Sequence, residues 1–259
     1  MTDSLYIAST GMHTQQESIN VISNNLANVN TPAFKKSKIS FVDLVYKPVN
    51  EQNTAAPFLD SSYELGSGAA ISGTSKSFTL GEIKTTDRAL DIAINGDGFI
   101  EVDLLDGSKA YTRNGSLSIN AESLLTTNDG FVLSPSIQIP EDSTDVVIGT
   151  DGKVQVSIPD ESELIEVGQI DLVKFISAEN LKPIGNNLYL PTADSGDAIF
   201  GTPGEDGLGI VAQGFLESSN VNLIEEMVNL ILAQRAYEIN SKVIQASDEM
   251  LTLSNNMRR

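Results

Sequence analysis

A stripe of apolar side chains recurs at helical spacing near the start of the chain. The stripe consists of Leu5, Ala8, Met12, Ile19, Ile22, Leu26 and Val29, with Gln15 at one polar position. Alternating intervals of three and four residues are typical of a helix that buries one face against a neighbouring helix. Proline cannot continue a helix, so Pro32 predicts that this helix stops near Asn30.

The end of the chain repeats the pattern. Its stripe consists of Leu232, Ala236, Ile239, Val243, Ala246, Met250, Leu253 and Met257, and Val221, Ile224 and Val228 lead into it. Asn222, with Glu225 three residues later, is typical of a capped helix start. Arg258 and Arg259 suit the negative pole of a helix end. We therefore expect a second long helix.

Two apolar stripes of this length need partners. One alternative is that the two helices pair with each other inside a monomer. Stripes sustained over several heptads at both ends favour the other alternative, contacts between subunits. We predict an assembly interface, in the same chain or in neighbouring chains, made of Leu5, Ala8, Met12, Ile19, Ile22, Leu26, Val29, Val228, Leu232, Ala236, Ile239, Val243, Met250 and Leu253.

Between the helices the pattern changes to strands and turns. Strands are predicted around Ala93–Ile94, Phe99–Leu105, Val146–Ile148, Val154–Ile158, Ile170–Ile176 and Leu188–Leu190. Asn-Gly and Asp-Gly pairs, which favour hairpin turns, stand at Asn95-Gly96, Asp97-Gly98, Asp106-Gly107, Asn114-Gly115, Asp129-Gly130 and Asp151-Gly152. The fold class predicted is α+β, with terminal helices in a coiled-coil-like inner domain and a central antiparallel β domain.

The segment between the first helix and the β domain has its own composition. Pro48, Pro57 and several Gly and Ser residues occur without any sustained period, whereas Phe58, Leu59 and Tyr63 indicate that the segment packs on something. We expect an extended connecting segment. The predicted organisation is residues 1–31 first helix, 32–70 connecting segment, 71–215 β domain and 216–259 second helix.

Charge and composition limit the partners. The formal net charge is −19, and most of the acidic residues lie in the middle of the chain. Such a chain is repelled by nucleic-acid phosphates and by anionic lipid, so we expect no nucleic-acid partner. No segment approaches the roughly 20 apolar residues of a membrane span, and the N-terminus lacks a signal-peptide pattern, so we expect no membrane insertion. The protein then stays in the cytoplasm or leaves by a route that cleaves nothing.

Candidate chemistry is sparse. There is no cysteine, and His13 is the only histidine, so neither a metal site nor a nucleophile–base pair is indicated. Nucleotide-binding glycine motifs are absent. We expect no catalytic residue, cofactor or metal, although abundant carboxylates leave an acidic wall-active hydrolase open. The basic cluster Lys35, Lys36 and Lys38 either pairs with an acidic neighbour or solubilises the helix exit, and we prefer the second interpretation.

Three short motifs carry a family resemblance. The first contains Asn24, Asn25, Leu26, Ala27, Asn28, Pro32 and Phe34, the second contains Asn220, Val221 and Asn222, and the third contains Arg235 and Tyr237. With Gly96-Asp97-Gly98-Phe99 and the stretch Tyr111–Ser116 between them, the sequence resembles the flagellar basal-body rod and hook proteins over nearly its whole length. Its length and the stretch Arg235–Lys242 are most similar to distal rod members, with proximal rod proteins as the alternative.

The resemblance implies a structural role. It implies export through the flagellar type III apparatus without a cleaved signal, location in the periplasmic rod of the basal body, and polymerisation into a helical tube that transmits torque. The implied partners are further copies of the chain, other rod proteins, the hook protein and the outer rings around the rod.

Overall fold

The computed structural model describes residues 2–49, 63–159 and 164–257. The chain divides into two compact units. A helical unit contains Met1–Ala27, Ser37–Ser75 and Asn222–Arg259, and a β unit contains Asn28–Lys36 and Lys76–Val221. The chain therefore passes from one unit to the other at four points. Residues 32–70, expected as one connecting segment, are shared between the two units.

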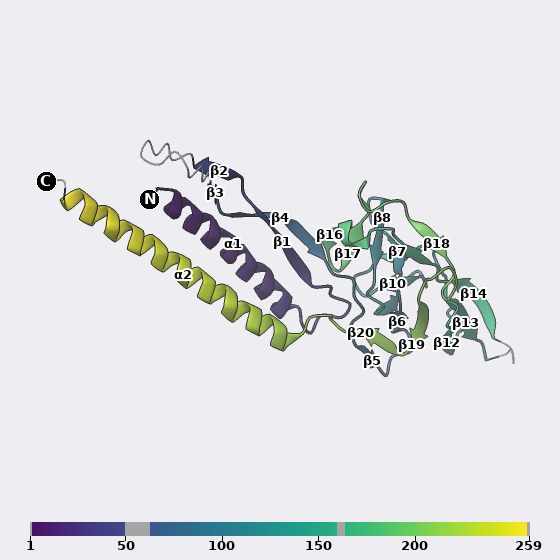
Figure 1. Ribbon diagram of the computed structural model, residues 1–259. Coiled ribbons are helices and arrows are strands. Elements are labelled where there is room, and N and C mark those ends of the chain that lie inside the picture. Colours follow the sequence, from purple (N-terminus) through teal and green to yellow (C-terminus); the bar gives the residue numbers. More distant parts are fainter. Residues whose placement is uncertain (1, 50–62, 160–163, 258–259) are drawn as a thin grey trace. The chain divides into compact units, whose positions relative to one another are not determined.

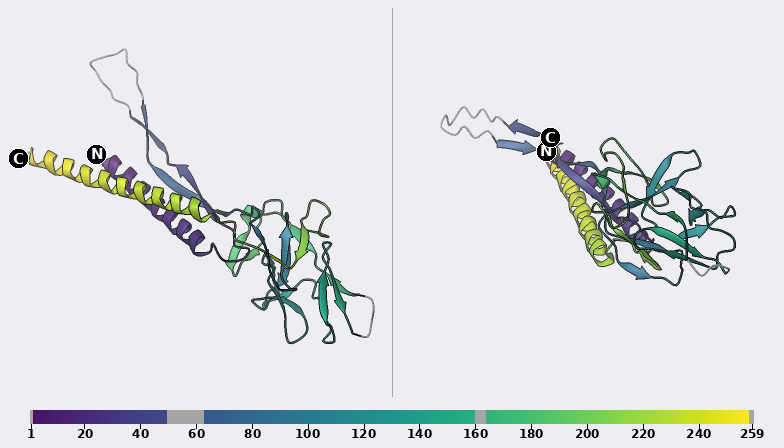
Figure 2. Two further views of the ribbon diagram at one scale, coloured as in Figure 1. Left: turned by 90° about the horizontal axis from the view of Figure 1, so that it is seen from below. Right: turned by 90° about the vertical axis from the view of Figure 1, so that its right-hand side faces the viewer.

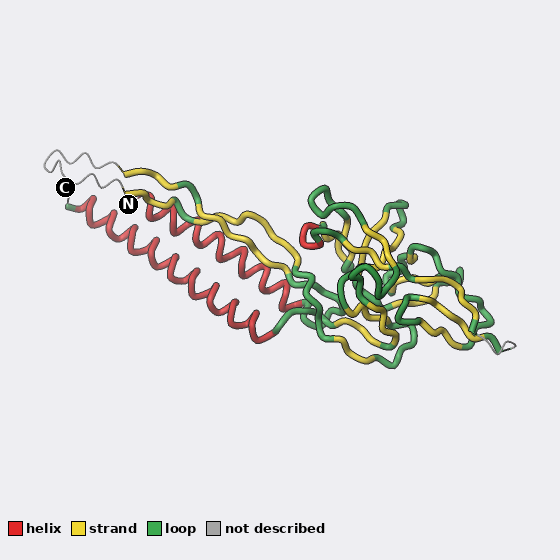
Figure 3. The backbone as a smooth tube through the Cα atoms, turned by 45° about the vertical axis from the view of Figure 1, so that its right-hand side comes forward, coloured by secondary structure: helices red, strands yellow, loops and turns green. Residues whose placement is uncertain are grey.

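The helical unit is built from two antiparallel helices, α1 (Thr2–Ala27) and α2 (Leu223–Asn256). Strand β1 (Ser37–Asp43) pairs with β4 (Ala69–Lys76), and β2 (Tyr46–Val49) pairs with β3 (Tyr63–Gly66). Within this unit α1 lies between α2 and the β1–β4 ribbon (Figures 1 and 2). Figure 3 shows the ribbon following the helices along much of their length. Phe58 and Leu59 lie outside the described residues.

The helix ends follow from local hydrogen bonding. Asn222 is the N-cap of α2, as predicted, and its Oδ1 accepts from the backbone N–H groups of Ile224 and Glu225 at 3.0 and 3.3 Å. Helix α1 ends at Ala27, three residues before the position that Pro32 indicated. Asn28 starts a turn there, because its carbonyl and side-chain oxygens accept from the N–H and hydroxyl of Thr31.

The paired strands of the β unit are antiparallel and form one large sheet with smaller ones (Figure 1). The large sheet has the order β16-β17-β8-β7-β11-β10-β9, and β15 pairs with both β7 and β18. Its strands are β7 (Phe99–Asp103), β8 (Lys109–Thr112), β9 (Leu117–Ile119), β10 (Leu125–Thr127), β11 (Val132–Leu133), β15 (Leu172–Lys174), β16 (Lys182–Gly185), β17 (Leu188–Leu190) and β18 (Ile199–Gly201).

Shorter ladders complete the β unit. A three-stranded sheet joins β12 (Asp145–Ile148), β13 (Lys153–Ser157) and β14 (Ile165–Gln169). Two pairs join β6 (Ile92–Asn95) to β19 (Ile210–Gln213) and β5 (Ile83–Thr85) to β20 (Phe215–Glu217). A short 3₁₀ helix covers Ala178–Asn180. The main core gathers aliphatic side chains, and in a second cluster the rings of Phe99, Tyr111, Phe175 and Tyr189 meet edge to face.

The predicted hairpin turns divide into two groups. Asp106-Gly107, Asp129-Gly130 and Asp151-Gly152 join neighbouring strands, namely β7–β8, β10–β11 and β12–β13. The remaining pairs lead to strands that are not partners: β6 to β7, and β8 to β9. Gly115 serves close approach instead, since an added Cβ would lie 1.8 Å from the carbonyl oxygen of Ile92. The α+β class with a central antiparallel domain is confirmed. Several predicted strands were too long, because Leu104 and the exposed Leu105 lie beyond β7, Ile158 lies beyond β13, and Ile170 and Ile176 lie outside β15.

Candidate assembly surface and buried ion cluster

The face of α2 that is covered by α1 is largely polar or small. Its covered positions recur at intervals of three and four residues: Glu226, Leu230, Ala233, Ala236, Asn240, Ile244 and Ser247. An added Cβ at Gly11 of α1 would lie 2.9 Å from the Asn240 amide nitrogen, so the two helices approach closely there. Polar and small side chains thus share this face of α2 with Leu230 and Ile244.

Apart from Ala236, the predicted apolar stripe of α2 lies on a different face. Leu232 and Ile239 are 61% and 60% exposed, and Val228, Val243, Met250 and Leu253 are also exposed, whereas Ala236 is half-buried. Ile224, Met227, Ile231 and Met257 widen the exposed apolar surface. We call this exposed apolar surface the α2 stripe. It is not covered by α1 of the same chain.

The predicted positions of α1 are covered more fully. Ala8 and Ile22 are buried, and Leu5, Met12, Ile19 and Leu26 are half-buried, while Val29 belongs to the β unit and is half-buried. Tyr6 and Ile7 are the large apolar side chains of α1 that stay exposed among its described residues. The structure thus brings the α1 positions into the packing of the helical unit and leaves the α2 positions open.

One buried polar contact between the helices was not predicted. Asn25, on α1, donates from Nδ2 to Glu226 Oε2 at 3.3 Å and to the Ser37 carbonyl at 3.0 Å, and its Oδ1 accepts from the Ser37 N–H. Asn25 and Glu226 are almost fully buried. The two residues fix α1 against both α2 and β1. The sequence offered a signal for this contact, because Asn25 stands three residues after Ile22 of the apolar stripe and therefore near the same face of α1.

The remaining signature residues take varied positions. Phe34 and Val221 are buried in the β unit, Asn28 and Asn222 are at helix ends, and Ala27 is the last residue of α1. Asn24, Pro32, Arg235 and Tyr237 are exposed. Arg235 pairs with Glu238 at 2.8 Å. Of the signature, Asn25, Phe34 and Asn220 make the contacts that organise the fold.

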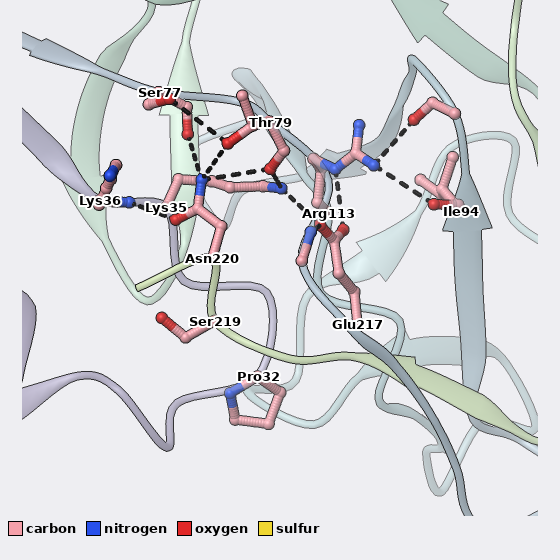
Figure 4. Close-up of polar contacts among 12 residues, drawn as sticks. Pro32, Lys35, Lys36, Ser77, Thr79, Ile94, Arg113, Glu217, Ser219 and Asn220 are labelled. Carbon is pink, nitrogen blue, oxygen red and sulfur yellow. Dashed lines mark hydrogen bonds and ion pairs between the residues drawn. The ribbon is translucent and has the colours of Figure 1, made fainter. Parts of the chain in front are cut away.

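A buried ion cluster lies inside the β unit (Figure 4). Lys35 is 0% exposed, and its ammonium donates to Glu217 Oε1 at 2.5 Å and to the Thr79 carbonyl at 2.7 Å. Arg113 donates from Nε to Glu217 Oε2 at 3.0 Å. The preferred interpretation of Lys35 as a solubilising residue was wrong, because the side chain points inward to an acidic partner far away in the sequence.

The rest of the cluster is hydrogen-bonded to backbone. The Arg113 guanidinium donates to the carbonyls of Ile94, Gly96 and Gly98. Glu217 also accepts from the Gly81 N–H at 2.9 Å. Buried charges need such partners, since desolvation of an unpaired ion is costly. Three segments of the β unit therefore meet at one carboxylate.

The electrostatics of the cluster favour an ionised carboxylate. Burial alone would raise the pKa of Glu217, but the charges of Arg113 and Lys35, with the Gly81 N–H, lower it below its usual value. Burial and the Arg113 charge lower the pKa of Lys35, although Glu217 opposes them. Glu217 is the group on which the cluster depends, because it faces both cations.

Asn220 ties backbone segments together beside the ion cluster (Figure 4). Its Oδ1 accepts from the Lys36 N–H at 2.8 Å, and its Nδ2 donates to the Ser77 carbonyl at 2.7 Å and to Thr79 Oγ1 at 3.0 Å. Its own N–H donates to the Phe34 carbonyl at 3.3 Å. The Ser77 N–H in turn donates to the Lys36 carbonyl.

Over the described ranges, no three His, Cys, Asp or Glu side chains are grouped to hold a metal ion. His13 is exposed on α1. None of the helices in the described part of the chain is long and apolar enough to cross a membrane.

Comparison with known proteins agrees with this architecture. Residues 5–35 match the family described as flagella basal body rod protein, residues 93–156 the D1 domain of flagellar hook protein FlgE/F/G, and residues 212–257 the C-terminal part of flagellar basal body rod FlgEFG proteins. The chain belongs to the family of flagellar basal-body rod and hook proteins.

Individual relatives narrow the similarity. The flagellar basal-body rod protein FlgG of Buchnera aphidicola subsp. Schizaphis graminum is 45% identical, covering 97% of this chain and 98% of its own. In Bacillus subtilis, FlgG is 38% identical and the flagellar hook-basal body complex protein FlhP is 32% identical, each over the full length of both chains. Within the family the chain is thus similar to FlgG.

Proposed function

We propose that this chain is a structural subunit of the flagellar distal rod, which polymerises into a helical tube and transmits torque from motor to hook. The observation that carries the proposal is the α2 stripe, exposed in a chain whose full-length relatives are named basal-body rod proteins. A contiguous exposed apolar surface of this kind is typical of an interaction site.

The α2 stripe supplies a driving force for assembly. Burying apolar surface contributes about 25 cal/mol per Å², or roughly 1.5 to 3 kcal/mol for each large aliphatic side chain. Because α1 covers another face of α2, this burial is gained only when a second molecule covers the stripe. A head-to-tail contact that does not close on itself then produces a helical polymer.

We further propose where the two units lie in the rod and which partners surround them. The helical unit forms the inner tube, the β unit is the outer domain, and the chain is exported through the flagellar type III apparatus without a cleaved signal. Partners are further copies of the chain, other rod proteins, the hook protein and the outer rings, at the periplasmic part of the basal body. The resemblance in the terminal motifs supports these assignments.

The assembly surface is tested with one added charge. Val243→Asp places a carboxylate in the α2 stripe without disturbing a buried contact, since Val243 is exposed in the single chain. We expect a folded monomer that no longer enters rods, because burial of an unpaired carboxylate costs several kcal/mol. Basal bodies isolated from cells that make only this variant are imaged, and the β unit is checked by circular dichroism.

The matched control is Gln245→Asp. Gln245 is exposed on the same turn of α2 but outside the stripe, so this variant should assemble normally. Normal rods built from Val243→Asp would refute the role of the stripe.

The alternative within the family is a proximal rod subunit of the FlgF type. Cross-linking in intact basal bodies separates the two, since contacts to hook-junction or outer-ring proteins indicate the distal position. Contacts restricted to the base of the rod would replace the distal assignment. We further propose that the chain has no catalytic activity, which release of wall fragments by the purified protein would contradict.

A further inference from the structure

The four points where the chain passes between units are not equivalent in the structure. They lie between residues 27 and 28, 36 and 37, 75 and 76, and 221 and 222. Asn220 lies within two residues of the last of these points, which we call crossings. Its side chain is hydrogen-bonded to Lys36 and Ser77, which lie within two residues of the second and third crossings, and all three residues belong to the β unit. Segments that are distant in the sequence therefore converge at one side-chain amide.

The residues bonded to Asn220 are also hydrogen-bonded to each other. Its carboxamide bonds Lys36 and Ser77, and the Ser77 N–H bonds the Lys36 carbonyl at 2.9 Å. The Lys76 ammonium donates to the Lys35 carbonyl at 3.0 Å and lies over the Phe34 ring. We call Lys36, Ser77, Thr79 and Asn220 the junction clamp.

The ion cluster anchors the same segments in the β unit. The Lys35 ammonium donates to the Thr79 carbonyl and to Glu217. Lys35 is next to Lys36 in the sequence, Thr79 is two residues after Ser77, and Glu217 is three residues before Asn220. The Ala33 N–H also donates to the Glu217 carbonyl at 2.7 Å. Each segment is thus held by a hydrogen bond of Asn220 and by a second interaction in the buried ion cluster.

We infer that Asn220 is a positioning residue that couples three chain crossings, so that force passing between the two units is shared by three segments. This inference rests on the proposed torque-bearing function. Hydrogen bonds loaded together resist displacement better than bonds broken one after another. Without the carboxamide, each segment can be drawn out of its place separately.

The test replaces the amide by an isosteric apolar group. Asn220→Leu keeps the side-chain size and removes the bonds to Lys36, Ser77 and Thr79. In the purified full-length chain we expect the Lys36 amide to exchange hydrogen at least about tenfold faster, with Val102 in β7 unchanged. In cells we expect rods in normal number that lose rotation at a lower load, measured as swimming speed in media of rising viscosity.

Asn180→Leu is the matched control. The Asn180 amide also bonds a backbone carbonyl and a hydroxyl, those of Asp194 and Ser177, away from the crossings. This variant should keep the wild-type load curve. A merely structural loss of stability lowers the number of rods, whereas a loss of coupling changes the load dependence of intact rods.

The outcomes separate the two hypotheses. Unchanged exchange at Lys36, or a load curve equal to that of Asn180→Leu, would overturn the role of Asn220. If Asn220→Leu yields no rods, Thr79→Val removes one clamp bond and should give a smaller shift of the load curve, and the wild-type curve would contradict the inference. Intact rods in cells that lack the whole protein would instead refute the proposed function.

Discussion

Single residues decide the stability of the β unit where charges are buried. Glu217 accepts from both Lys35 and Arg113, so each cation has Glu217 as its ionic partner whereas Glu217 has two. Without Lys35, Glu217 still has Arg113 and the Gly81 N–H. Without the Glu217 charge, two buried cations face each other across a neutral group.

This asymmetry gives a measurable ranking of variants. We expect Glu217→Gln to lower the free energy of unfolding by about 3 to 5 kcal/mol, because it leaves buried charge uncompensated. Lys35→Met, which removes a buried cation, should cost less. Urea unfolding of the purified chain, followed by the near-ultraviolet signal of its tyrosines, measures both. Equal losses in the two variants would contradict the account.

The same carboxyl makes stability depend on acid. The folded-state pKa of Glu217 lies below its usual value of 4.5, so its contribution is present above that pH and is lost as pH falls through the folded-state pKa. The stability difference between wild type and Glu217→Gln should therefore shrink below about pH 4.5. Urea unfolding repeated between neutral and acid pH tests this, and a constant difference would exclude Glu217 as the titrating group.

At the scale of elements, local signals in the sequence were the dependable ones. Asn222 predicted the start of α2, and the Asp-Gly pairs at 106, 129 and 151 predicted three turns, because capping and turn geometry involve only neighbouring residues. The strand partners could not be predicted in this way. Whether two strands lie side by side depends on the packing of the whole β unit.

The pairing face of α2 shows a second limit. The apolar positions predicted an interface, but the face covered by α1 contains Glu226, Asn240 and Ser247. These polar residues weaken the hydrophobic signal of the face, although Leu230, Ala233 and Ile244 also lie on it. Lys35 was misjudged for a related reason, since its partner Glu217 is known only once the chain has folded.

For the whole molecule, the two units differ in how much apolar surface they bury. The β unit has an extended aliphatic core, whereas the contact between α1 and α2 includes the polar side chains of Asn25, Glu226 and Asn240. We expect the amides of α2 around Ile239 to exchange hydrogen at least about a hundredfold faster than Ile100 and Val102 in the isolated chain. Exchange measured in dilute protein tests this.

The same measurement in assembled rods provides the comparison. Covering the α2 stripe should slow exchange in α2 and leave the β-unit strands unchanged. Equal protection of α2 in the isolated chain and in the rod would show that the stripe is not buried on assembly.

The four crossings also determine how the chain can vary. The sequence of the β unit is interrupted only by the segment Ser37–Ser75, and its main body is inserted between that segment and α2. The chain enters this main body near Ser77 and leaves it at Asn220, and a hydrogen bond joins these two residues. The residues between them therefore form a module whose two ends are held together. A larger or smaller module grafted at these two points would leave the sequence of both terminal helices unchanged.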